Sequence, residues 1–174
     1  LDGRDGFTNS NGLVADQINT TGAGSELLTN GDFGATTGWT EVGCALTNPS
    51  SQGKITNDGG INGRIHRTFS TTTGKTLRLQ YDLIATDSTS VAMYISTNNS
   101  TSGMVISSAN DNTIGTKKTL YTTATADTLY VLIYAVGADT KFVTVDNVSV
   151  KEMGTGGGAM INMTASDFTG DVPR

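Results

Sequence analysis

The sequence predicts an all-β protein whose strands form a sandwich of two mainly antiparallel sheets. Short runs of alternating apolar and polar residues recur about every 8–12 residues, the spacing expected of an all-β sandwich or barrel. Clusters of Gly, Asn and Asp separate these runs. The runs and their connections are too short to contain helical crossovers, so the sheets should be mainly antiparallel.

The composition fits this fold and one domain with tails. The chain has 174 residues and a mass of 18.0 kDa. Hydrophobic residues make up 36% and charged residues only 16%, so most of the polarity comes from Thr, Ser, Asn and 22 Gly. A disordered chain would combine low hydrophobicity with high net charge. Uncharged polar residues instead suit sheets with tight turns and solvated outer faces.

Charge and cysteine content exclude several kinds of partner and site. The net charge is −5 and the pI about 4.6, without a Lys/Arg cluster, so we expect no nucleic-acid partner. No apolar run approaches the roughly 20 residues that span a bilayer, so we expect no membrane span. Cys44 is the only cysteine, which excludes an internal disulfide and predicts a small buried residue. The chain begins with Leu1 and shows no secretory signal pattern, so we expect a processed form or a fragment.

Three parts follow one another along the chain. Residues 1–25 contain closely spaced turn signals and few apolar residues, which predicts an extended arm. This arm is either a flexible tail or a segment ordered by a neighbouring subunit. Residues 26–153 contain the predicted strands and form the sandwich. Residues 154–174 form a Gly-rich linker and a tail too short to bury a core of its own.

The strands are expected where the alternation is clearest. They are assigned to residues 60–69, 76–87, 91–97, 104–106, 116–125, 128–136 and 142–152, and Cys44 sits in a further alternating run at 39–46. In the stretch 76–87 four side chains should face the core: Leu77, Leu79, Tyr81 and Leu83. The stretch 128–136 is apolar on both faces, which predicts a central strand. Residues 116–125 include two exposed lysines, which predicts an edge strand.

The same alternation gives a candidate surface for sugar binding. Sugars stack on aromatic rings and bond to polar side chains. Six such side chains point away from the predicted core and would share one face if their strands were neighbours: Arg64, His66, Arg78, Gln80, Tyr94 and Tyr134. The alternative, an ordinary solvated sheet face, stays open because aromatic residues make up only 6% of the chain. We expect Trp39 to be a core anchor rather than a stacking platform.

Two motifs near the ends of the sandwich carry a family resemblance. Leu-Leu-Thr-Asn-Gly-Asp-Phe at 27–33, followed by Gly38 and Trp39, resembles the first strand of the jelly-roll carbohydrate-binding modules of families 4, 9 and 22. Val-Thr-Val-Asp-Asn-Val-Ser-Val at 143–150 resembles their last strand. The resemblance covers about residues 26–152 and implies a jelly-roll-like β-sandwich. Such modules occur in secreted glycoside hydrolases and in structural proteins of tailed bacteriophages, and the chain's ending is more similar to the phage setting.

The resemblance also implies a calcium site. In these modules a calcium ion often joins the first and last strands, and Asp32 and Asp146 match the positions of its ligands. Gly34 stands where the family often has Glu, which would weaken the site. The alternative is that Asp32 caps a turn and Asp146 satisfies the end of a strand.

No enzyme signature is present in the sequence. It lacks a Gly-x-Ser-x-Gly elbow, a phosphate loop and a His-Glu-x-x-His motif, and nothing marks two carboxylates as a glycosidase pair. His66, the only histidine, has no evident catalytic neighbour. We therefore expect a non-enzymatic virion or extracellular structural module, such as a phage capsid decoration, fibre or tail component.

This module would associate with other structural subunits as a homo-oligomer, for which a trimer is suitable, and recognise cell-surface glycans. The alternatives are a carbohydrate-binding module of a secreted polysaccharide-degrading enzyme and an adhesin or surface-layer subunit.

Overall fold

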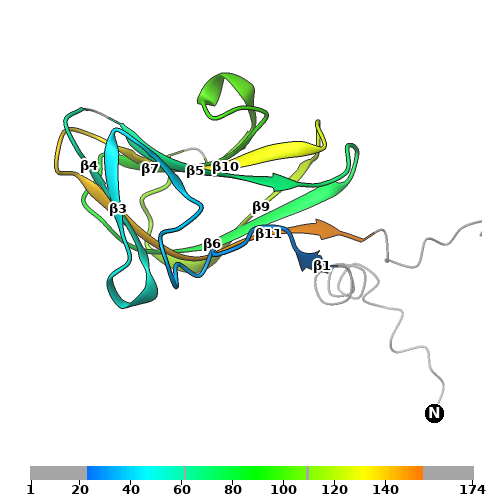
Figure 1. The fold of residues 1–174 in the computed structure, drawn as a ribbon, viewed down its shortest axis with the longest axis horizontal. Coiled ribbons are helices and arrows are strands. Elements are labelled where there is room, and N and C mark those ends of the chain that lie inside the picture. Colours follow the sequence, from blue (N-terminus) through cyan, green and yellow to red (C-terminus); the bar gives the residue numbers. More distant parts are fainter. Residues whose placement is uncertain (1–22, 61, 109, 155–174) are drawn as a thin grey trace, which may run out of the picture. The chain divides into compact units, whose positions relative to one another are not determined.

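The computed structural model describes residues 23–60, 62–108 and 110–154. Most of the predicted arm at 1–25 and of the predicted tail at 154–174 lies outside the described residues. The described residues form eleven strands in two antiparallel sheets, so the predicted all-β sandwich is confirmed (Figure 1). They contain no helix long and apolar enough to cross a membrane.

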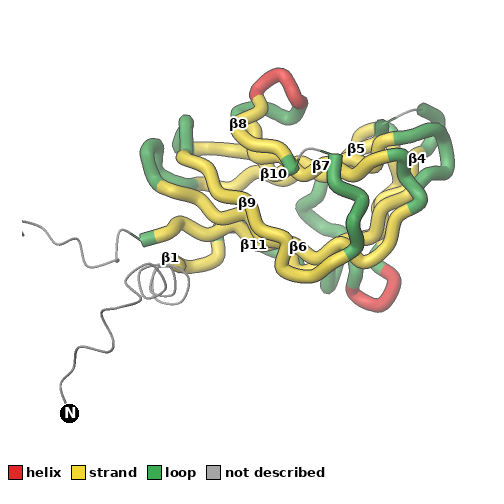
Figure 2. The backbone as a smooth tube through the Cα atoms, turned by 180° about the vertical axis from the view of Figure 1, so that it is seen from behind, coloured by secondary structure: helices red, strands yellow, loops and turns green. Residues whose placement is uncertain are grey.

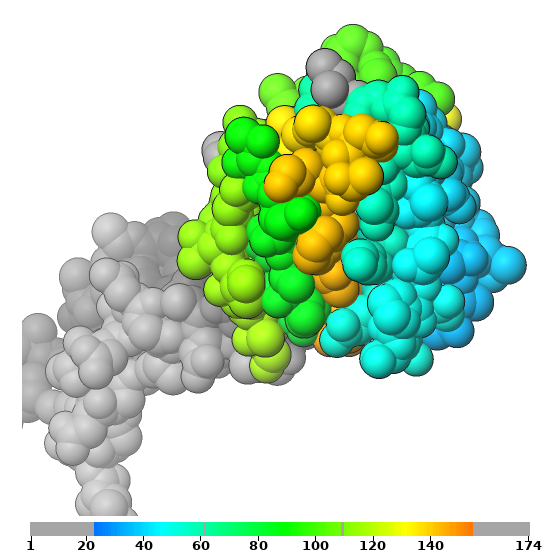
Figure 3. All heavy atoms as spheres, turned by 90° about the vertical axis from the view of Figure 1, so that its left-hand side faces the viewer, coloured from blue at the N-terminus to red at the C-terminus, as the bar shows by residue number. Residues whose placement is uncertain are grey.

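Within each sheet, several neighbouring strands are far apart in the sequence (Figure 2). Sheet A has the order β3 (Cys44–Thr47), β4 (Gly53–Asn57), β11 (Phe142–Met153), β6 (Thr76–Thr86) and β9 (Gly115–Thr123), and β1 (Ala23–Glu26) also pairs with β11. Sheet B has the order β2 (Thr40–Val42), β5 (Gly63–Ser70), β10 (Thr128–Val136), β7 (Ser90–Ser96) and β8 (Met104–Ser107). Two short 3-10 helices, η1 (Pro49–Ser51) and η2 (Thr101–Gly103), lie in connections. In Figure 3 the orange residues of β11 lie between the green of β6 and the blue-green of β4, as the pairing requires.

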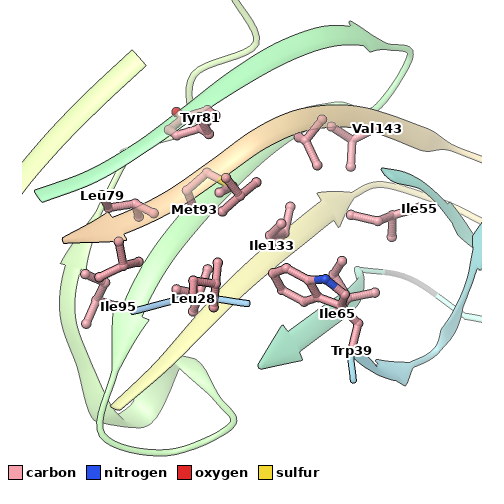
Figure 4. Packing of buried hydrophobic residues seen from close by; sticks show 14 of the residues in the cluster. Leu28, Trp39, Ile55, Ile65, Leu79, Tyr81, Met93, Ile95, Ile133 and Val143 are labelled. Atoms are coloured by element: carbon pink, nitrogen blue, oxygen red, sulfur yellow. The ribbon is translucent and has the colours of Figure 1, made fainter. Parts of the chain in front are cut away.

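The core lies between the sheets and follows the predicted alternation. The four inward side chains of β6 are 0–2% exposed: Leu77, Leu79, Tyr81 and Leu83. Met93 and Ile95 of β7 and Ile133 of β10 pack in the same cluster (Figure 4). As predicted, β10 is a central strand and β9 is an edge strand. Burying these side chains supplies the main driving force for folding.

The structure differs from these expectations in three places: β1 lies mostly within the predicted arm at 1–25, and the other two are the stretch 39–46 and strand β4. The stretch 39–46 is two strands, β2 in sheet B and β3 in sheet A, because Gly43 has a φ of +63° and turns the chain from one sheet to the other. Strand β4 was not predicted at all. It contains a single large apolar residue, Ile55, so its sequence shows no clear alternation.

The segment between β1 and β2 closes the sandwich and explains the first motif. Trp39 is 7% exposed and stacks on Phe33 with ring centroids 5.3 Å apart, and its Nε1 donates to the carbonyl of Asn30 at 3.0 Å. Trp39 is therefore a core anchor, as expected. The motif also meets the last strand, because the amide of Val148 donates to the carbonyl of Gly31 at 2.9 Å. A Cβ at Gly31 would clash with the carbonyl oxygen of Val148.

Cys44 is buried, as predicted for a small residue in an alternating run. Its thiol donates to the carbonyl of Arg64 at 3.2 Å. Burial raises the pKa of the Cys44 thiol, which disfavours the reactive thiolate. The residue therefore packs the edge of the sandwich.

Candidate functional site

The outer face of sheet B presents a cluster of aromatic side chains around one leucine. On β10, Leu132 is paired with His66 of β5 on one side and with Tyr94 of β7 on the other. Tyr130 and Tyr134 lie two residues away on the same strand and point in the same direction. Four rings therefore surround Leu132, which is 0% exposed although it points away from the main core.

These rings hold one another in edge-to-face pairs. His66 and Tyr130 have centroids 5.8 Å apart at 64°, and Tyr94 and Tyr134 have centroids 5.3 Å apart at 79°. Edge-to-face contact is a favourable geometry for aromatic pairs. His66 and Tyr134 are buried, whereas Tyr94 and Tyr130 are half-buried and still offer surface to a ligand. We call this surface the tyrosine face: Arg64, His66, Tyr94, Tyr130, Leu132 and Tyr134.

Arg64 lies at one end of the tyrosine face. Its guanidinium carbon is 5.5 Å from the centroid of the Tyr134 ring, and its Nε donates to the carbonyl of Asn99 at 3.0 Å. Asn99 belongs to the connection between β7 and β8 that contains η2, the red helix beside β8 in Figure 2. These two contacts restrict the direction of the arginine side chain.

The tyrosine face is weakly charged. Burial lowers the pKa of His66, and the nearby Arg64 guanidinium lowers it further, so the imidazole is neutral at physiological pH. Burial raises the pKa of Tyr134, which keeps its hydroxyl protonated. Hydroxyl side chains flank the rings at positions paired with them: Thr40, Thr68, Ser96 and Ser107.

The six residues predicted to share a surface are divided between the two sheets. Four of them belong to the tyrosine face: Arg64, His66, Tyr94 and Tyr134. Arg78 and Gln80 also point away from the core, but they lie on β6 in sheet A. There Arg78 pairs with Tyr121 and Gln80 with Thr119 of β9, and Gln80 Nε2 donates to Thr119 Oγ1 at 3.1 Å. Alternation predicted the direction of both side chains and could not predict the sheet.

Gln80 lines a shallow polar pocket on sheet A, with a volume of about 390 Å³. Its walls come from β1, the first motif, β6 and the last motif: Glu26, Leu28, Asn30, Gly31, Asp32, Gln80, Asn147, Val148 and Ser149. Several of its polar groups already bond to the protein. Glu26 accepts from the amide of Val150 at 2.7 Å, and the side chain of Asn30 donates to the carbonyl of Thr37 at 3.0 Å.

The proposed calcium ligands form local turn contacts. Asp32 Oδ1 accepts from the amide of Gly34 at 3.4 Å, and Asp146 Oδ1 accepts from the amide of Asn147 at 2.7 Å. Calcium takes roughly six to eight oxygen ligands. Within the described residues, no three His, Cys, Asp or Glu side chains converge to hold a metal. The contacts of Asp32 and Asp146 are those that the alternative interpretation as caps predicts, and a calcium ion at these residues stays a prediction.

Tyr130 and Leu132 also belong to the tyrosine face, although they were not among the six predicted site residues. Both share the alternation of Tyr134, so the signal for their direction was present in the sequence. Their importance arises from pairing β10 with β5 on one side and with β7 on the other. The periodicity of a single strand does not predict which strands it pairs with.

Comparisons with known proteins show the fold. No family model and no curated protein matches the chain. Among solved structures, a family 4 carbohydrate-binding module has a TM-score of 0.54 at 14% identity over 72% of this chain and 99% of its own. The second N-terminal cellulose-binding domain of Cellulomonas fimi β-1,4-glucanase C has a TM-score of 0.54 at 14% identity over 75% and 95%.

A third similar structure comes from a virus. The enzymatically active domain of tailspike protein 4 of bacteriophage CBA120 has a TM-score of 0.53 at 15% identity, over 74% of this chain and 21% of the tailspike chain. The chain thus has the two-sheet antiparallel sandwich fold of carbohydrate-binding modules, a fold also present within a phage tailspike.

Proposed function

We propose that this protein is a non-enzymatic glycan-binding module and that the tyrosine face is its binding surface. The observation that supports this most is the set of rings packed around Leu132 on an otherwise outward-facing side of sheet B. Rings held in place before binding lose little conformational freedom when a ligand arrives. The fold shared with carbohydrate-binding modules is consistent with this role.

The chemistry of the tyrosine face suits a sugar. Half-buried Tyr94 and Tyr130 offer ring surface to the apolar faces of a pyranose. The flanking hydroxyls of Thr40 and Thr68 are within the same surface and can exchange hydrogen bonds with sugar hydroxyls.

Binding without catalysis is supported by the distribution of carboxylates. The strands of sheet B contain one acidic residue, Glu41, which alternates to the side opposite Thr40. Its Oε2 accepts from the amide of Leu46 at 3.0 Å. A glycosidase acting on this face would need two carboxylates across the bound sugar.

The test is glycan binding by the full chain and two tyrosine variants. Tyr94→Ala should weaken binding about tenfold or more, because ring anchors dominate the energy of such interfaces. Tyr121→Ala is the matched control, since Tyr121 is exposed on β9 of sheet A. Binding would be measured on an array of neutral and acidic glycans, with thermal unfolding to verify the fold. Equal binding by both variants and the unchanged protein would exclude the tyrosine face.

A second proposal concerns the setting, a virion or extracellular structural protein that forms a homo-oligomer. It is supported by the similarity to part of a phage tailspike and by the low charge of the chain, which suits close packing between subunits. Light scattering on the full chain should then give the mass of a discrete oligomer, such as a trimer. A monomer at every concentration would argue against self-assembly and favour an appended binding module.

A further inference from the structure

Arg64 is the charged residue on the outward-facing side of sheet B. Among the outward positions of the described strands β2, β5, β10, β7 and β8, the others are aromatic, aliphatic or hydroxyl-bearing. In a chain of net charge −5, this surface therefore has a local positive charge. The neighbouring imidazole of His66 does not add to it at neutral pH.

The end of the Arg64 side chain keeps hydrogen-bonding capacity. Its Nε is used by Asn99 and its plane lies near Tyr134, but within the described residues no hydrogen bond or ion pair engages the two terminal nitrogens. These nitrogens form the planar pair of donors that matches a carboxylate.

The described strands hold two other arginines, and their side chains are placed differently. Arg67, three residues along β5, uses both terminal nitrogens inside the protein: Nη1 donates to the carbonyl of Thr37 at 3.0 Å and Nη2 to Thr29 Oγ1. Arg67 therefore ties the segment before β2 to sheet B. Arg78 lies on sheet A, where it pairs with Tyr121, and its buried Nε has no hydrogen-bond partner among the described residues. Unused donors alone therefore do not distinguish Arg64, which differs from Arg78 in its place beside the rings of the tyrosine face.

We propose that the tyrosine face selects acidic glycans, with a sugar carboxylate, as in a uronic or sialic acid, paired with the terminal nitrogens of Arg64. This inference rests on the proposed glycan-binding function and names the ligand class for the same site. One pyranose ring would contact Tyr94 or Tyr130, and the carboxylate would lie toward Tyr134. Because aromatic side chains border the guanidinium, the ion pair would be less screened than one fully in water.

The experiment uses an array with matched pairs of glycans that differ in the carboxylate. Oligogalacturonates are paired with their methyl esters, and sialyllactose with lactose. The full-length protein should bind the acidic member about tenfold more tightly than its neutral partner, since a charged hydrogen-bonded pair is worth about one decade in affinity. The preference should shrink in roughly molar salt.

Three variants locate the preference. Arg64→Gln should bind the acidic and neutral members equally, whereas Arg64→Lys should keep part of the preference because it keeps the charge without the planar pair of donors. Arg78→Gln removes an equal charge from sheet A and should leave the preference for acidic glycans unchanged. Thermal unfolding of Arg64→Gln controls for loss of the Asn99 contact.

The outcomes separate this inference from the proposed function. If acidic and neutral members bind equally and Tyr94→Ala abolishes both, the module binds glycans but the acidic selectivity is wrong. An acidic preference that survives in Arg64→Gln also overturns the inference. If no glycan of either class binds, the proposed function and the inference both fail.

Discussion

The outer faces of the two sheets follow the same alternation and have different chemistry. Sheet B displays rings around Leu132 and one guanidinium with unused donors. Most of the carboxylates and amides that sheet A displays bond within the protein, to backbone amides, hydroxyls or one another, and Arg78, whose buried Nε has no partner among the described residues, is an exception. Asp82 is typical: its Oδ1 accepts from the amide of Lys117 at 2.6 Å and its Oδ2 from Asn147 Nδ2 at 2.8 Å.

This difference separates a structural surface from a surface with unused binding capacity. Lys117 and Asn147 both have positive φ, 53° and 50°, at irregular points of their strands, and Asp82 holds both. The polar groups of sheet A therefore stabilise irregular backbone. On sheet B, the rings and Arg64 leave ring surface and donors available. The comparison teaches that an outward polar residue is a weak indicator of function until its partners are known.

The largest expected effect is on stability, in the small buried cluster of Ala92, Leu132 and Tyr134. Leu132→Ala should lower the free energy of unfolding by about 2–5 kcal/mol, because the leucine is fully buried although it points outward. Gln80→Ala, an outward position on sheet A, should change it by less than about 0.5 kcal/mol. Urea unfolding of both variants measures the contrast. Equal, small losses would show that the rings do not form a second packed cluster.

The next largest effect concerns Asp82, whose replacement should lower stability without changing glycan affinity. Asp82→Ala removes both contacts of the carboxylate, and we expect a loss of about 1–2 kcal/mol of unfolding free energy with glycan affinity unchanged. Asp58→Ala, at an exposed turn, is the control with little expected loss. Urea unfolding and the glycan array together test this. Weaker glycan binding by Asp82→Ala would place sheet A in the binding site.

The smallest expected effect is a dependence of stability on pH through His66. The folded state lowers the pKa of His66 below its ordinary value near 6.5 because burial disfavours the imidazolium. The unfolded chain therefore takes up the proton first, and stability is lost as pH falls below about 6.5 and on through the folded pKa. Above this range His66 does not make the free energy of unfolding depend on pH. Urea unfolding at pH 7.5 and 5.5, with His66→Gln as control, should show a smaller difference in the variant; an identical difference would argue against the effect.

The sequence predicted side-chain directions better than it predicted neighbours. The inward positions of β6, such as Tyr81, and of β7, such as Met93, followed from alternation alone. The separation of Gln80 from Tyr94 depends on which strands pair, and this is decided by contacts between distant parts of the chain. For the same reason, the meeting of Asp82 with Asn147 across sheet A could not be predicted.

Local exceptions account for the remaining differences. Strand β4 has only Ile55 as a large apolar residue, so its sequence shows no alternation, and it is held by pairing with β3 and β11. Gly43 interrupts an otherwise regular alternation and moves the chain to the other sheet. The residues of the first motif, which carries the family resemblance, serve mainly to close the sandwich, as the stacking of Trp39 on Phe33 shows.

The most direct test is to map a bound glycan on the protein by NMR. Isotope-labelled full-length protein would be titrated with oligogalacturonate, and the shifts of backbone amides followed. The account predicts that perturbed amides cluster on β5, β10 and β7 around Leu132, with little change near Gln80 and Asn147. Shifts confined to the pocket on sheet A, or none at saturating ligand, would contradict it.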